Sequence, residues 1–359
     1  MAYTTINKSS EHFNTKLYTG NGSTQNITGV GFQPDLVWAK RRSADGWHFW
    51  TDAVRGAGKA IYSNRSDAEF TDTDSSDINS FLTDGFSVGS NADINGNGQT
   101  HVGWNWKAGT TGSGTTTGSG TGKAYSYSVN TTSGFSIVKY VGNGSAGHTI
   151  PHHLGVAPKM VAIKNLSDGQ SWRVGFTTLG FSKYLAFNNT DAQASNSVMF
   201  NNTDPTSSVF TLGSDGSTNA NNENFIAYCF AEKTGYSKIG SYAGNGNVDG
   251  TFVYTGFKPA WVMIKGSGST GNYYSWSIFD TTRQTFNVNA GKTLYANRDY
   301  QEGKRGQGTA STTIPAIDML SNGFKCRVLN DEVNTTTSYV FMAFGQSLVG
   351  SNNVPCTAR

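Results

Sequence analysis

Charged residues and cysteines are scarce in this sequence. Lys, Arg, Asp and Glu make up 14% of the 359 residues, with 27 basic and 24 acidic side chains well mixed along the chain. A net charge of +3 without a basic cluster argues against binding to nucleic acid or to an anionic membrane. The three cysteines, Cys229, Cys326 and Cys356, show no paired spacing, so we expect no disulfide framework.

Signals for targeting and membrane insertion are also lacking. The first fifteen residues hold no apolar run of the kind found in a secretory signal peptide. Nowhere do 18 apolar residues run together, as a membrane-spanning helix requires. We therefore expect no signal peptide and no membrane insertion; a protein of this kind that works outside a cell would leave it by lysis or by a non-classical route.

Helical periodicity is the third feature that is missing. No stretch keeps apolar residues at helical spacing over three turns, whereas short runs of Val, Ile, Phe, Tyr and Thr recur throughout. The 44 glycines and the 13% of aromatic residues favour many short strands joined by tight turns. The composition therefore predicts an all-β protein.

An internal repeat is the most informative feature that is present. The strings YTGNGS, YVGNGS and YAGNGN begin at Tyr18, Tyr140 and Tyr242, and further markers follow them in the same order each time. The markers are Pro34, Pro158 and Pro259; Trp47, Trp172 and Trp276; Asn64, Asn188 and Asn297; and the closing aromatics Trp106, Phe230 and Phe344. The chain thus holds three tandem copies of one unit.

The repeat markers and the linker composition predict the domain boundaries. An N-terminal segment covers residues 1–11, module 1 covers 12–107, module 2 covers 124–235, module 3 covers 236–349, and a tail covers 350–359. Residues 108–123, AGTTGSGTTTGSGTGK, contain no apolar side chain beyond one alanine, so we expect them to form a flexible linker.

The strand after each repeated proline is apolar on both faces. In the first copy, Val37 and Ala39 lie on one face and Leu36 and Trp38 on the other, and the other copies repeat this pattern. With about seven short strands per copy and turn signals such as Asp84-Gly85, the pattern predicts three tandem antiparallel β-sandwich modules of jelly-roll or concanavalin-like type. A sister module or a second protomer must cover the second face, and we expect the protein to form a homo-oligomer.

Recognised catalytic and metal-binding patterns are absent. There is no GxSxG elbow, no phosphate-binding GxxxxGK[ST] loop and no Cys/His signature. Asp72, Asp74 and Asp77 could bind calcium or form an acid/base pair, but a solvated loop explains them more simply. His148, His152 and His153 lack further zinc ligands nearby, and the loop that starts at Asp93 lacks the acidic twelfth residue of an EF-hand. We expect no enzyme activity, no catalytic residue, no cofactor and no metal site.

Aromatic residues are the candidates for contacts with a ligand or a partner. The recurring tryptophans Trp47, Trp172 and Trp276 could stack on sugar rings, although their recurrence also suits a role in the core. The pairs Tyr125 with Tyr127 and Tyr273 with Tyr274 occur in one copy each, and specific contacts usually lie where repeats differ. We take these seven residues as candidate glycan or protein contacts.

The string GFQPDLVWAKRRSADGWHFWTDAVRGAGKAIYSNRSDAE, followed by SFLTDGFSVGS and VGWNWKAG, resembles a family of repeat proteins found in tailed phages, many of them marine. TSGFSIVKYVGNGSAGHTIPHHLGVAPKMVAIKN and AYCFAEKTGYSKIGSYAGNGNVDGTFVYTGFKPAWVMIK look like its second and third units, so the resemblance covers nearly the whole chain. It implies a virion structural protein with lectin-like or laminin-G-like sandwich modules. The family supplies no catalytic or ligand residues to transfer.

Three functions are compatible with these observations. The first is a virion surface protein, either a subunit of a tail fibre or appendage or a capsid decoration, made in the host cytoplasm and bound to other virion proteins and to itself. Such a protein could also contact host surface glycans. The second is a soluble multivalent carbohydrate-binding protein, in which three copies would raise a weak single-site affinity. The remote third is a polysaccharide depolymerase, which would need a pair of carboxylates about 5 to 10 Å apart in a groove.

Overall fold

The computed structural model describes residues 4–271, 273–284, 292–305, 308–309, 316–330 and 332–349. In this part of the chain, short antiparallel strands dominate, and the α-helices are single turns of four residues. The expected all-β class is confirmed, and the sheets pack face to face as in a sandwich. Cys356 and the tail 350–359 lie outside the described residues.

The strands form three sheet pairs that follow the sequence repeats. Sheet pair 1 has a large sheet in the order β1-β9-β3-β4-β5-β6 and a small sheet β2-β8-β7. Its elements, after a 3-10 turn at Ser9–Glu11, are β1 (Phe13–Thr19), β2 (Gln25–Thr28), β3 (Leu36–Arg41), β4 (His48–Asp52), β5 (Lys59–Tyr62), β6 (Phe70–Thr71), β7 (Ile78–Leu82), β8 (Gly85–Val88), α1 (Ala92–Asn95) and β9 (Thr100–Trp106).

Sheet pair 2 has a large sheet β10-β12-β13-β20-β15-β16, a small sheet β11-β14-β19 and a short ribbon β17-β18. Its elements are β10 (Thr110–Thr115), β11 (Thr117–Gly118), β12 (Ala124–Asn130), β13 (Phe135–Val141), β14 (His148–Pro151), β15 (Met160–Asn165), β16 (Arg173–Phe176), β17 (Lys183–Tyr184), β18 (Ala194–Ser195), α2 (Ser197–Phe200), β19 (Val209–Leu212), α3 (Gly216–Asn219) and β20 (Asn224–Phe230).

Sheet pair 3 has a large sheet β21-β30-β23-β24-β25, a small sheet β22-β29-β28 and a ribbon β26-β27. Its elements are β21 (Ser237–Ala243), β22 (Phe252–Tyr254), β23 (Pro259–Gly266), β24 (Ser277–Asp280), β25 (Leu294–Tyr295), β26 (Lys304–Arg305), β27 (Gly308–Thr309), β28 (Ile317–Leu320), β29 (Gly323–Cys326) and β30 (Ser338–Gly345).

The expected flexible linker at residues 108–123 is wrong. β10 pairs with β12 over six residues, from Thr110 opposite Val129 to Thr115 opposite Ala124, and β11 pairs with β14. One segment thus adds an edge strand to both sheets of pair 2. Gly112 and Gly114 make this possible, because the rings of Tyr127 and Tyr125 lie over them, where larger side chains would collide.

Each large sheet is apolar on both faces because it packs on both. Val37 and Ala39 of β3 face the small sheet of their own pair, and they share one core with Phe86 and Ile78 of that small sheet. Sheet pairs 2 and 3 have equivalent cores between their own two sheets. The opposite face joins one cluster that contains residues of all three pairs, including Trp38, Phe230 and Trp261. The sister pairs therefore cover the second face within one chain.

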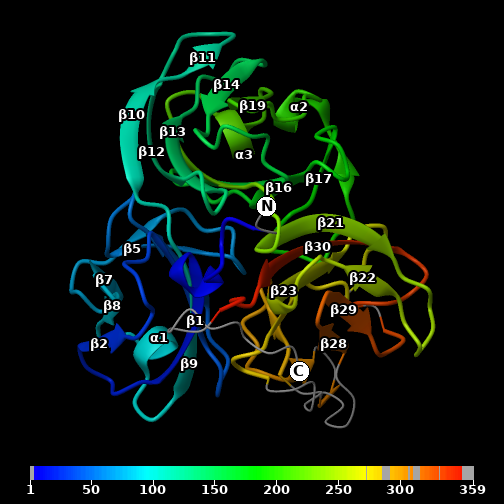
Figure 1. Ribbon diagram of the computed structural model, residues 1–359. Helices are drawn as coiled ribbons and strands as arrows, with labels where there is room; N and C mark the ends of the chain where they lie inside the picture. The colour runs from blue at the N-terminus through cyan, green and yellow to red at the C-terminus, as the bar shows by residue number, and fades with distance from the viewer. Residues whose placement is uncertain are drawn as a thin grey trace.

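Figure 1 shows the three sheet pairs as three lobes around a common centre, with pair 2 at the top, pair 1 at the lower left and pair 3 at the lower right. The closing strands β9, β20 and β30 each bring one aromatic residue to this centre. The rings of Trp106, Phe230 and Phe344 form a triangle with centroid separations of 5.8, 6.2 and 6.3 Å. The sequence repeat thus becomes a cyclic arrangement with three junctions, which we name the 1/2, 2/3 and 3/1 junctions after the pairs that meet.

Candidate functional site at the junctions between sheet pairs

The structure corrects the alignment of the recurring tryptophans by one residue. An asparagine side chain accepts a backbone N–H bond in each pair, from His48 to Asn64, from Trp172 to Asn188 and from Trp276 to Asn297, at 3.0, 3.1 and 2.9 Å. The equivalent of Trp172 and Trp276 is therefore His48 and not Trp47. Trp47 precedes the first residue of β4 and remains 37% exposed.

The indoles of Trp172 and Trp276 tie neighbouring sheet pairs together. The Nε1 of Trp172 donates to the carbonyl of Tyr62 in pair 1, and that of Trp276 donates to the carbonyl of Ala186 in pair 2, both at 2.9 Å. Their side chains are 0% and 1% exposed. No sugar can reach them, so the expectation that Trp172 and Trp276 contact a glycan or partner is wrong; they are core residues of the junctions.

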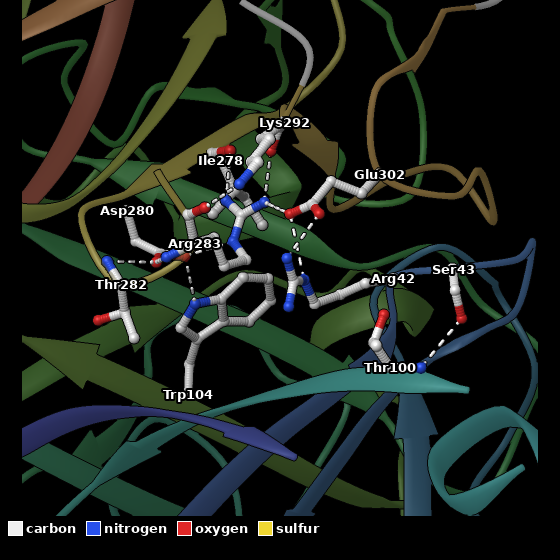
Figure 2. A network of polar contacts seen from close by, with 10 residues as sticks. All are labelled: Arg42, Ser43, Thr100, Trp104, Ile278, Asp280, Thr282, Arg283, Lys292 and Glu302. Carbon is white, nitrogen blue, oxygen red and sulfur yellow. Dashed lines mark hydrogen bonds and ion pairs between the residues drawn. The ribbon is translucent and has the colours of Figure 1, made fainter. Parts of the chain in front are cut away.

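An ionic cluster occupies the 3/1 junction (Figure 2). Arg283 donates from Nε to Asp280 and from Nη1 to Glu302, the latter at 2.9 Å, and both Asp280 and Arg283 are fully buried at their side chains. Glu302 also accepts from Nη2 of Arg42 in pair 1, at 2.7 Å. Trp104 of pair 1 donates its indole N–H to Asp280 at 3.1 Å. The cluster thus joins groups of both pairs across the junction.

The 1/2 junction holds the same cluster in equivalent positions. Arg55 donates to Asp52 and, at 3.3 Å, to Glu69, while the Tyr228 hydroxyl of pair 2 donates to Asp52 at 2.7 Å. At the 2/3 junction the equivalent residues are apolar or neutral, namely Phe176, Leu179, Gln193 and, in place of the tyrosine, Met342. At the 2/3 junction the carboxylate and its donor are therefore both absent from the equivalent positions, so these positions hold no buried carboxylate that lacks a donor.

These carboxylates do not form an acid/base pair for catalysis. Burial alone would lower the pKa of Arg283, but Asp280 and Glu302 raise it, so the guanidinium stays charged. Its Nη2 donates to the carbonyl of Ile278 at 3.0 Å, and Asp280 already accepts from the indole of Trp104. Because Asp280 and Arg283 are closed off from solvent and engaged with each other, the cluster holds the junction together and offers a substrate no access.

The equivalent strands β3, β15 and β23 each carry a buried lysine at the same position of the repeat. Lys40, Lys164 and Lys265 are 0% exposed, and each Nζ donates to the carbonyl of the residue that follows it. Lys40 also reaches the carbonyl of Asp299 in pair 3, and Lys265 that of Thr190 in pair 2, at 3.0 and 3.2 Å. Burial lowers the pKa of these lysines to about 7, 8 and 7 respectively.

The repeated lysine was visible in the strings VWAK, VAIK and VMIK, but sequence reasoning passed over it. A lysine at the end of an apolar strand is usually exposed, and only the neighbouring sheet pair buries this one. The same holds for Asp52 and Asp280. In the sequence they look like ordinary turn residues, and only the contact with a neighbouring sheet pair buries them. Burial by a sister pair left no local signal in the sequence.

The tyrosine candidates lie at two separate places. Tyr125 and Tyr127 are half-buried on β12 and stack with His153, whose ring centroid lies 3.7 Å from that of Tyr127. Tyr273 is 41% exposed, whereas Tyr274 packs its ring over Gly266. The structure does not bring the two pairs together, and their role as contacts stays a prediction.

Trp47 also stays a candidate, but the Arg65 side chain covers one face of its indole. The Arg65 guanidinium lies 4.2 Å from the centroid of the Trp47 ring, and Tyr62 meets it edge-on at 5.1 Å. A ligand that stacks on the face that Arg65 covers would have to displace Arg65, which also pairs with Asp67.

The aspartate loop is held by its own backbone. Asp72 accepts the N–H groups of Asp74 and Asp77 at 3.1 and 2.9 Å, as in turns that an aspartate side chain stabilises. Asp93, which opens the EF-hand-like string, pairs with Arg41 at 3.0 Å. Among the residues that the structure describes, no three His, Cys, Asp or Glu side chains come together as metal ligands.

The histidine cluster is dispersed in the structure. His148 bridges Asn219 and Thr116 at 2.8 and 2.6 Å, so both its ring nitrogens are engaged. His152 bonds to the carbonyl of Thr206 at 3.1 Å, and His153 belongs to the tyrosine stack.

Cys229 and Cys326 are buried and free. In the described part of the chain no helix is long and apolar enough to cross a membrane.

The fold and the junctions define a class: a cyclic arrangement of three antiparallel sheet pairs, joined by buried aromatic and ionic contacts. The chain belongs to the family described as a domain of unknown function, DUF7483, whose model matches residues 8–347. No curated protein and no solved structure matches the chain.

Proposed function

We propose that this protein is a non-catalytic structural protein of a virion surface, either a subunit of a tail fibre or appendage or a capsid decoration. The setting follows from the resemblance of its repeat strings to structural proteins of tailed phages. The proposal includes other virion proteins and further copies of the chain as partners.

One observation supports this role most directly. The buried ionic clusters lie at the junctions, and the small sheets of pairs 1 and 2 face outward with neutral side chains. The small sheet of pair 3 carries Asp318 and Lys325 on that face, opposite each other. On β2, for example, the exposed residues are Asn26 and Thr28. Surfaces of low charge bearing hydroxyl and amide groups suit a protein that contacts neighbours on a particle.

The second apolar faces no longer require a second protomer, because the sister pairs cover them. Self-association stays a prediction. It would have to use a surface other than the second apolar faces, from which it was predicted. Localisation tests the structural role: antibody-gold labelling of intact particles and mass spectrometry of purified particles should both detect the protein. Its absence from particles that are otherwise complete would contradict the proposal.

Carbohydrate binding is the second candidate, and one patch in sheet pair 3 favours it. Phe252 and Tyr254 project from the same face of β22 and are 43% and 62% exposed. Gly323 lies opposite Tyr254 on β29, and the Phe252 ring packs against it, where a Cβ would lie 3.1 Å from Phe252 Cε2. Exposed aromatic rings next to polar groups suit the apolar faces of sugars.

A glycan array tests this candidate with a matched control. The variant Phe252→Ala/Tyr254→Ala should lose binding, whereas Asn26→Ala/Thr28→Ala, on the equivalent strand β2, should keep it. A wild-type array without signal would remove the candidate. The depolymerase alternative finds little support, since the carboxylates of the junction clusters are engaged with arginines.

A further inference from the structure

A cavity of about 250 Å³ opens at the 3/1 junction beside the edge of β1. Its lining carries hydroxyl and amide groups and no charged side chain. Phe13 and Thr15 of pair 1 contribute to it, as do Ala260, Thr281 and Ser347 from pair 3 and its end. Phe13 belongs to the central apolar cluster, so the cavity reaches from the surface toward the centre of the molecule.

The backbone of β1 presents open hydrogen-bonding groups at this cavity. Lys107 donates to the carbonyl of His12, and Gly20 donates to that of Gln99, so the even-numbered residues of β1 pair with β9. The N–H and carbonyl of Thr15 therefore point away from β9, toward the free edge of the sheet. Because Thr15 also lines the cavity, its backbone donor and acceptor are available to a ligand there.

At the 1/2 junction the equivalent place is filled by a strand. Ile137 of β13 corresponds to Thr15, since it lies two residues after the residue opposite the closing aromatic, and it pairs with Ser128 of β12. The Ser128 hydroxyl donates to Asp35 at 3.0 Å and accepts from the N–H of Gly109. Asp35 and Gly109 correspond to Ala260 and Ser347, which line the cavity.

At the 2/3 junction a carboxylate fills the equivalent place. Ile239 of β21 corresponds to Thr15, and its N–H donates to Glu232 at 2.9 Å. Lys238 pairs with the same carboxylate. Two of three equivalent edges thus have a partner from the chain itself.

The described part of the segment that corresponds to β12 does not fill the third edge. Residues 4–8 form no strand, and the carbonyl of Asn7 instead accepts from the N–H of Leu348 at 2.9 Å. The cavity is therefore the space that a strand such as the end of β12 occupies at the 1/2 junction.

We propose that the edge of β1 and its cavity accept an extended peptide segment of a partner protein, which adds to the large sheet of pair 1 antiparallel to β1. Main-chain bonds to Thr15 give affinity, and the cavity selects small, uncharged side chains, because it holds no opposite charge for an ionic one. The internal precedent is β12 on β13. This inference goes beyond the proposed function and depends on geometry alone, so its failure leaves the localisation test of that function unchanged.

The test uses the full chain and a capped peptide with the sequence of β12, AYSYSVN. In amide NMR spectra the peptide should shift the signals of Thr15 and Leu17 saturably, at millimolar or lower concentration, and should protect the Thr15 amide from exchange. The variant Thr15→Pro removes the edge donor without removing a bond to β9, and it should weaken binding at least about fivefold. Thr19→Pro, at the exposed far end of the same strand and facing the same edge, is the matched control and should bind as the wild type does.

Three outcomes would overturn the inference. The first is that the peptide causes no saturable shifts, although thermal unfolding shows the protein and both variants to be folded. The second is an equal loss of binding in Thr15→Pro and Thr19→Pro. The third is a shift of the same amides by neutral monosaccharides or by dilution-dependent dimers of the chain, which would make a sugar or a second copy the occupant.

Discussion

At the scale of single residues, buried polar groups decide how the sheet pairs meet. A buried ion pair contributes little net stability by itself, but removal of one partner leaves a charge without compensation. The junction clusters follow this logic, because the 2/3 junction replaces aspartate, arginine and the hydroxyl donor together. The polar residues therefore specify which faces come together, while the aromatic residues supply the buried area.

Removal of the arginine at the 3/1 junction tests this view. We expect Arg283→Met to lower the free energy of unfolding by about 3 to 5 kcal/mol, because Asp280 and Glu302 then lack their buried partner. Arg65→Met, at an exposed pair with Asp67, is the control and should cost at most about 1 kcal/mol. Urea unfolding measures both. Equal effects of the two variants would show that the cluster does not hold the junction.

The asparagine that ends α3 is a second test at this scale. Asn219 is fully buried, accepts from the N–H of Asn143 at 3.0 Å and donates to the carbonyls of Ser145 and Gly213 at 3.0 and 2.7 Å. Asn95 and Asn334 make the same kind of bonds in the other pairs. These bonds explain why the string with Gly-Asn-Gly recurs.

We expect Asn219→Ala to destabilise the protein by about 2 to 4 kcal/mol, since several buried backbone groups lose their partner. The exposed neighbour Asn221 is the matched control, and Asn221→Ala should change the unfolding free energy by less than about 0.5 kcal/mol. Thermal melts of both variants provide the measurement. A melting temperature like that of the wild type for Asn219→Ala would mean that the loop does not depend on this side chain.

At the scale of elements, the added strands of sheet pair 2 distinguish it from its neighbours. β10 and β12 extend the large sheet beyond β13, whereas β1 and β21 end the corresponding sheets of pairs 1 and 3. An edge strand exposes unpaired backbone groups, which proteins commonly protect with charged residues. Lys16 on β1 and Lys238 on β21 fit that pattern, and the chain itself covers the edge of β13.

Hydrogen exchange tests the strand that replaced the expected linker. Thr116 donates to the carbonyl of Lys123, so the even-numbered residues from 110 to 116 pair with β12 and the odd-numbered ones face the solvent edge. We expect slow exchange at Gly112 and Gly114 and fast exchange at Thr111 and Ser113. Uniformly fast exchange over residues 110–115 would restore the flexible linker.

At the scale of the whole molecule, ionisable groups are buried both at the junctions and within the sheet pairs, and stability should therefore depend strongly on pH. All six histidines have a lowered pKa, chiefly because burial disfavours the charged imidazolium, and that of His101 and His152 falls to about 4. Asp77 acts in the opposite direction, since burial raises its pKa to about 6.

On the acid side, the unfolded chain takes up protons on its histidines below about pH 6.5, whereas the folded chain does so only at lower pH. We therefore expect the free energy of unfolding to fall as the pH drops from 6.5 to 4, with protonation of Asp77 offsetting part of the loss.

On the alkaline side, Lys40, Lys164 and Lys265 lose their protons near pH 7 to 8 when folded but near 10.4 when unfolded. Stability should therefore rise from pH 7 toward 9.5.

Urea unfolding between pH 4.5 and 9.5 measures this profile. Lys265→Met should flatten the alkaline rise by up to about 1.4 kcal/mol per pH unit, because one buried lysine no longer titrates. Lys59→Met, at a partly exposed site, is the control and should keep the wild-type slope. A stability that is constant from pH 7 to 9.5 in the wild-type protein would contradict the argument.

Much of the fold could be predicted from the sequence, and less of the candidate site. The period of two in Val37 and Ala39 predicted a face that packs on a core, and the apolar Leu36 and Trp38 required cover on the other side. The linker prediction failed because glycine and hydroxyl residues without apolar side chains still form a strand when tyrosines of β12 cover them. The exposure of Trp47 and the burial of Trp172 could not be separated, since an alignment of strings carries no information about strand ends.

By itself the sequence determined the three copies, the all-β class and the two apolar faces, because these depend on local propensity and on alternation along a strand. Only the tertiary structure decided that sister pairs cover the second faces, which charged groups are buried and which edge stays open. Those features arise where segments far apart in the chain meet, as Trp104 meets Asp280 and Tyr228 meets Asp52. The free energy of a buried charge depends on the partner that the fold brings to it, and no local pattern records that partner.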